Sequence, residues 1–135
     1  MIALLQETLD TIQSEGGEYN KSFDLVDQLL LRYGESDLAN RLYSEIESLY
    51  PWETVADLFG ILIWSTSDNG SALTKVTDNW ITECNEERKV SIALHLDTYP
   101  FHDAAEMNEK LEKVSVKFPA LKNRCVELIN SRSSQ

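Results

Sequence analysis

The most constraining feature of this sequence is the segment at residues 51–64, PWETVADLFGILIW, because its apolar residues leave almost no polar face. The apolar positions recur at helical spacing and comprise Val55, Leu58, Phe59, Ile61, Leu62, Ile63 and Trp64. Pro51 suits the first turn of a helix, where its missing N–H needs no partner. The segment is too short to span a bilayer and contains two acids. We therefore predict a central core helix covered by protein, with Trp64 and, on a later stripe, Trp80 buried.

Seven further segments carry apolar residues at helical spacing between glycine, proline or capping residues. They span residues 1–14, 22–33, 36–49, 71–84, 85–96, 103–118 and 119–130. We predict Ser36, Ser71, Asn85 and Asp103 as N-caps, because short polar side chains accept hydrogen bonds from the first free amides. Residues 131–135 are predicted to be a frayed tail. No segment alternates with the period of a strand, so no strands are predicted.

The connections between these segments are short, which favours antiparallel neighbouring helices. The predicted hairpins begin at residues 2, 36, 71 and 103, and such spacing is typical of stacked two-helix repeats such as HEAT units. Tyr50-Pro51 and Phe118-Pro119 occupy equivalent turns inside two of the hairpins. We predict an all-α single domain over residues 1–135, built as a short stack of four antiparallel hairpins. A compact irregular bundle is the alternative.

Charge limits the classes of partner. The chain has 23 acidic and 12 basic residues, and residues 1–67 alone carry a net charge of −9. Repulsion from phosphates disfavours direct binding to nucleic acid, and an anionic membrane surface is disfavoured in the same way. A basic protein is the natural complement, since opposite fields speed association. The alternative interpretation is that the acidity only keeps the chain soluble.

Motifs for catalysis or metal binding are missing from the sequence. It has no Gly-rich phosphate loop, no Cys-x-x-Cys, no His-Glu-x-x-His and no Gly-x-Ser-x-Gly. Pro100 separates His95 from His102, so one helix cannot present both to a metal. Cys84 and Cys125 each lie on an apolar stripe and are predicted to be buried free thiols. We therefore expect no enzymatic activity, no cofactor and no metal.

The links between the predicted hairpins, residues 33–36, 64–69 and 97–103, should lie along one edge of the stack. Each link combines aromatic and acidic residues, which suits docking of a basic protein. The predicted partner-binding residues are Tyr33, Glu35, Asp37, Trp64, Asp68, Asp97, Tyr99, His102 and Asp103. The alternative is that Asp68 and Asp103 only cap helices, and that Tyr33 and Tyr99 only close the core.

Two of these links lie within WSTSDNGSALTKVTDNW and LHLDTYPF. Together with the small size, the acidity and the helical hairpins, these motifs resemble immunity proteins of bacterial polymorphic-toxin systems, in particular those of contact-dependent growth inhibition. The resemblance is clearest from about residue 52 to residue 101. It implies a cytoplasmic antidote that binds its cognate toxin domain, often a nuclease, and blocks the active site or access to substrate. Such families vary at the toxin-contacting surface, so no family residue is transferred to this chain.

An acidic domain of this kind suits a toxin with a basic nucleic-acid groove, because carboxylates can occupy the phosphate positions. The absence of a basic, apolar leader also predicts a cytoplasmic protein. Two other hypotheses stay open: a helical-repeat adaptor that holds a basic protein or peptide, and a small hydrolase whose carboxylate site has no sequence motif.

Overall fold

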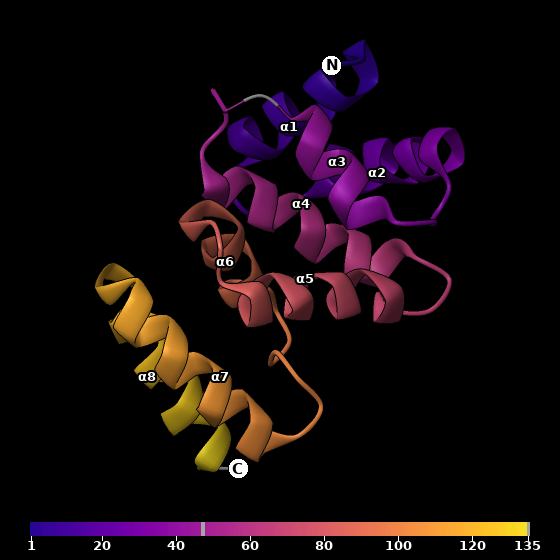
Figure 1. Cartoon of the computed structure of the whole chain (residues 1–135). Helices are drawn as coiled ribbons and strands as arrows, with labels where there is room; N and C mark the ends of the chain where they lie inside the picture. The colour runs from indigo at the N-terminus through magenta and orange to yellow at the C-terminus, as the bar shows by residue number, and fades with distance from the viewer. Residues whose placement is uncertain (47, 135) are drawn as a thin grey trace. The chain divides into compact units, whose positions relative to one another are not determined.

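The computed structural model describes residues 1–46 and 48–134, and within these residues it consists of helices and connections without a strand (Figure 1). The elements are α1 (Ala3–Glu15), α2 (Asn20–Tyr33), α3 (Leu38–Glu45), α4 (Trp52–Ser65), α5 (Ser71–Glu83), α6 (Glu87–Leu94), α7 (Ala104–Lys117), η1 (Pro119–Leu121) and α8 (Lys122–Ser133). The all-α class and the eight α-helices are confirmed. The packing of the helices is consistent with a helical stack.

The ends of the helices differ from the sequence predictions in several places. Asp103 does cap α7, since its side chain accepts a hydrogen bond from the Glu106 amide. Ser36 and Asn85 are not caps, because Asp37 and Glu86 occupy the positions before α3 and α6. The side chains of Asp37 and Glu86 accept no capping hydrogen bond from the first turns of these helices. Pro119 opens the short 3₁₀ turn η1, so α8 begins three residues later than predicted.

Contacts between Cα atoms divide the chain into two compact units, Met1–Val76 and Thr77–Gln135, which we call unit 1 and unit 2. The single domain over residues 1–135 stays a prediction. Unit 1 has a net charge of −9 and unit 2 a net charge of −2, from 13 acids and 4 bases against 10 acids and 8 bases.

The core of unit 1 is organised by α4. In this unit α1 packs against α2, and α4 packs against both of them. Leu58, Phe59 and Leu62 of α4 have no exposed surface. The prediction that this segment is a central core helix is therefore confirmed.

Trp64 is the exception, because 68% of its surface is exposed, so the prediction of its burial is wrong. Trp64 lies seven residues after Asp57 and eleven after Glu53, which places all three on one side of α4. Glu53 and Asp57 are themselves exposed. Trp64 therefore lies on the solvent-facing side of α4 with Glu53 and Asp57, and not on its buried apolar face.

The turn after α4 is fixed by Gly70. Its φ of +79° belongs to the left-handed region, and an added Cβ would lie 2.9 Å from the Ile63 Cα. The Gly70 amide donates to the Thr66 hydroxyl at 2.8 Å. This turn, predicted from the Asn-Gly pair, brings the start of α5 against the end of α4.

Unit 2 has its own apolar core, to which α5, α6, α7, η1 and α8 all contribute. Figure 1 shows α7 and α8 side by side as an antiparallel hairpin, in agreement with their contacts. Trp80 is 4% exposed, as predicted. Cys84 and Cys125 are buried free thiols, also as predicted, and burial raises the pKa of each above its ordinary value. Both therefore stay protonated at neutral pH.

Candidate functional site

The first two predicted links meet in unit 1. Glu35, just after α2, accepts hydrogen bonds from the Ser67 amide at 3.1 Å and from the Ser67 hydroxyl at 3.0 Å. Ser67 lies just after α4, so these bonds join the C-terminal ends of two packed helices. The residues of links 33–36 and 64–69 are thereby brought to one corner of unit 1.

The carboxylates at this corner have neutral hydrogen-bond donors. Asp37 accepts from the side-chain amide of Asn40 at 2.9 Å. Asp68 accepts from the backbone amides of Gly70 and Ala72, at 3.0 and 2.9 Å. These amide bonds, that of Ala72 first, lower the pKa of Asp68 and keep it ionised. Because neutral donors cancel no charge, these carboxylates present a negative surface.

One large apolar side chain is exposed close in sequence to these charges. Trp64, which is 68% exposed, stands three residues before Ser67. Exposed tryptophan surrounded by polar residues is typical of the anchor points of protein interfaces. We call the set Glu35, Asp37, Trp64 and Asp68 the α2–α4 corner.

Tyr33 is less available than these residues. It is half-buried, and its hydroxyl is buried close to the Glu45 side chain. Burial, followed by the nearby Glu45 carboxylate, raises the pKa of Tyr33. The Arg41 guanidinium lies 5.4 Å from the centre of its ring and donates to the Tyr33 carbonyl oxygen. Part of the Tyr33 ring is therefore packed inside unit 1, in agreement with the alternative interpretation that this residue closes the core.

The third link, residues 97–103, belongs to unit 2 and is held by Arg132. Its guanidinium donates to the carbonyl oxygens of Pro100, Phe101 and His102, at 3.2, 2.9 and 2.7 Å. It also lies 5.4 Å from the centre of the Tyr99 ring.

The prediction that residues 131–135 are a frayed tail is wrong through Ser133, where α8 ends, and Gln135 lies outside the described residues. Arg132 stands four residues after the buried Leu128, and this continuation of the apolar stripe was the overlooked signal.

Asp78 holds the same link from the side of α5. Its carboxylate accepts from the Phe101 amide at 3.2 Å, at a position where Phe101 adopts a φ of +64°. A bulky residue in this left-handed conformation is strained, and fixed partners have to hold it there. Burial, with a smaller effect from the Glu106 carboxylate, raises the pKa of Asp78 to about 6. Sequence reasoning missed Asp78, because nothing local distinguishes it from an exposed acid.

We expect Asp78→Asn to stabilise the protein at pH 7 and not at pH 4. The pKa of Asp78 is raised from 3.8 to about 6 in the folded chain, so folding favours the protonated form. Its contribution to stability is fully present below the unfolded pKa and is lost as the pH rises through the folded one. An amide still accepts from Phe101 but is never ionised. The gain at pH 7 should be about 1–2 kcal/mol, allowing for partial solvent exposure.

Thermal melts of both proteins at pH 4 and pH 7 check this prediction, with Glu112→Gln on the exposed face of α7 as the matched control. A lower melting temperature for Asp78→Asn at pH 7 would contradict it. The charged hydrogen bond to Phe101 would then stabilise the fold more than burial of the carboxylate costs.

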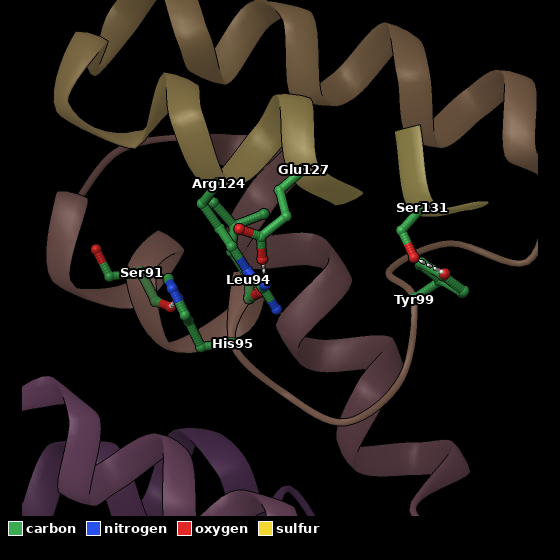
Figure 2. Close-up of polar contacts among 7 residues, drawn as sticks. All are labelled: Ser91, Leu94, His95, Tyr99, Arg124, Glu127 and Ser131. Atoms are coloured by element: carbon green, nitrogen blue, oxygen red, sulfur yellow. Dashed lines mark hydrogen bonds and ion pairs between the residues drawn. The ribbon is translucent and has the colours of Figure 1, made fainter. Parts of the chain in front are cut away.

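Asp97 and Tyr99 of the same link line a pocket of about 460 Å³ together with residues of α8. Figure 2 shows Arg124 and Glu127 at one end of this region and the pair Tyr99 and Ser131 at the other. Arg124 donates through Nε to the Leu94 carbonyl oxygen at 2.9 Å and forms an ion pair with Glu127. The hydroxyls of Tyr99 and Ser131 are 2.6 Å apart. In the same view, Nδ1 of His95, the residue that follows α6, lies 2.8 Å from the Ser91 carbonyl oxygen of that helix.

The structure thus separates the predicted binding residues into sets. Glu35, Asp37, Trp64 and Asp68 share the α2–α4 corner, with Tyr33 half-buried beside them. Asp97 and Tyr99 share the pocket of unit 2. The His102 side chain is exposed, while Asp103 is occupied with capping α7.

Comparisons of the chain with protein-family models, with curated proteins and with solved structures found no match. Within residues 1–46 and 48–134, no group of three or more His, Cys, Asp or Glu side chains could hold a metal ion. In the same part of the chain no helix has the length and apolar character needed to cross a membrane.

Proposed function

We propose that this protein is an immunity protein that binds one cognate toxin domain in the cytoplasm and neutralises it without catalysis. The observation that carries the proposal is the α2–α4 corner, where Trp64 is exposed close to carboxylates with neutral donors. It combines an aromatic anchor with three carboxylates, which suits a basic partner, although the Arg41 guanidinium on the Ser36 carbonyl oxygen offsets part of their charge.

The charge of unit 1 supports the same partner. A nuclease domain must attract phosphates and is therefore basic around its substrate groove. A net charge of −9 on residues 1–76 would steer such a domain toward unit 1. The resemblance to immunity proteins is clearest from about residue 52 to residue 101, and the first of its two motifs begins at Trp64, so it includes part of this corner.

The proposal predicts that a neighbouring reading frame encodes the toxin domain, and co-expression with that domain tests it. We expect growth to be restored and, in a purified assay, toxin activity to fall in proportion to added protein until the two are equimolar. Stoichiometric binding requires this dependence, because each bound toxin consumes one inhibitor. Full protection by a trace amount would indicate an enzyme. Capture of many unrelated basic peptides without protection would indicate an adaptor.

A further inference from the structure

The pocket of unit 2 is a site with a definite chemistry. Its lining includes two apolar side chains, Leu96 and Leu128, which are 6% and 7% exposed. The polar groups around it belong to Asp97, Thr98, Tyr99, Arg124, Glu127 and Ser131. A volume of about 460 Å³ lies in the range of sites that bind small molecules or single side chains.

The charged groups of this pocket favour a cation over an anion. The Arg124 guanidinium is already engaged by the Leu94 carbonyl oxygen and by the Glu127 carboxylate. The Asp97 carboxylate is exposed, and no hydrogen bond or ion pair joins it to any residue that the structure describes. With Arg124 balanced by Glu127, the formal charge that remains among the lining residues is the negative charge of Asp97. The nearby Arg132 guanidinium lies on the Tyr99 ring and is held by the carbonyl oxygens of Pro100, Phe101 and His102.

The rest of the lining suits a particular kind of cation. Lysine and arginine carry their charge on an apolar stem, which packs along apolar surface while the charged end stays near water. Leu96 and Leu128 supply that apolar surface, and Asp97 supplies the carboxylate at the outer edge. The hydrogen bond between Tyr99 and Ser131 and the contacts of Arg132 with the link hold the two sides of the pocket in place.

We propose that this pocket receives one basic side chain, arginine or lysine, of the protein partner. The source of that side chain rests on the proposed function, and the site itself rests on the geometry of unit 2. The pocket would be a second binding point, in addition to the α2–α4 corner. It would select partners that carry one positively charged side chain at the matching position.

Titration with the tripeptide N-acetyl-Gly-Arg-Gly-amide, followed by backbone amide NMR shifts of the full-length protein, tests the site without the toxin. We expect saturable shifts at residues 96–99 and 124–131. Asp97→Asn should weaken the binding about fivefold, as expected for loss of a partly exposed ion pair. The matched control is Glu112→Gln, an exposed acid on α7 that does not line the pocket, and it should leave the affinity unchanged.

Several results would overturn the proposal. Equal shifts with the glutamine tripeptide would show that the charge plays no part, and stronger shifts with the glutamate tripeptide would assign the pocket to an anion at Arg124. Tighter binding of spermidine than of the arginine tripeptide would assign it to a free polyamine. Absence of saturable shifts at these residues would remove the site altogether.

The same variant separates this proposal from the proposed function. A toxin that is neutralised equally by the wild type and by Asp97→Asn, with no tripeptide binding, would refute the pocket and keep the immunity function. Binding of the tripeptide without any neutralisation of the toxin would keep the pocket and refute the immunity function.

Discussion

Leu62→Ala should lower the free energy of unfolding by about 2–5 kcal/mol, the largest stability effect that we expect from a single substitution. Leu62 has no exposed surface and lies in the helix that packs against both α1 and α2. Removing its branched end takes apolar contacts away and leaves a cavity that rigid neighbouring helices cannot fill. For a domain with an ordinary total of about 5–15 kcal/mol, this is a large fraction.

Urea denaturation followed by circular dichroism measures this loss. Leu31→Ala is the matched control, since it deletes the same atoms from a side chain that is 89% exposed, and it should cost less than about 0.5 kcal/mol. If Leu62→Ala cost no more than Leu31→Ala, α4 would not be the centre of unit 1. The slope of the transition has to stay constant for this comparison to hold.

Trp64→Ala should weaken toxin binding about 30-fold or more, as expected for an interface anchor worth at least about 2 kcal/mol. The side chain is 68% exposed, so the fold should lose little stability. Its indole would be covered on binding, and the loss should therefore appear mainly in the dissociation rate. Surface plasmon resonance with the immobilised toxin domain would measure both rates.

Leu49→Ala controls for general surface apolarity, because Leu49 is 85% exposed in unit 1 but is not part of the α2–α4 corner. Equal affinities of the wild type and Trp64→Ala would place the interface elsewhere. Truncation of Trp64 is a cleaner test than charge reversal at Asp68 or Asp103. Both of these carboxylates accept hydrogen bonds from amides at a helix start, so reversal would change helix stability together with charge.

Helices were predictable from this sequence because the period of apolar residues is a local property. The apolar stripe of residues 51–64 predicted α4 and its burial, and Gly16 and Gly34 end α1 and α2 at positive φ. The segment at 36–49 was less well predicted, since α3 ends at Glu45. Its apolar positions continue past that point, but position 47 lies outside the described residues, and Leu49 is exposed.

The candidate site was only partly predictable. The acidic and aromatic content of the links could be read directly, and so could the capping by Asp103. That Glu35 bonds to Ser67, 32 residues further along, could not be read, because no local pattern specifies a partner at that distance. Arg132 and Asp78 were missed for the same reason, since each acts on backbone groups that are 23 to 32 residues away.

The sequence by itself determined the helical class, the core position of α4, the free thiols and the concentration of negative charge in the first half of the chain. These properties depend on composition and on spacing within a few turns. Tertiary structure decided that Trp64 faces solvent, that two links share one corner and that a pocket opens beside Asp97. Burial and hydrogen bonding between distant segments depend on which helices pack together, and that choice is made by the whole chain.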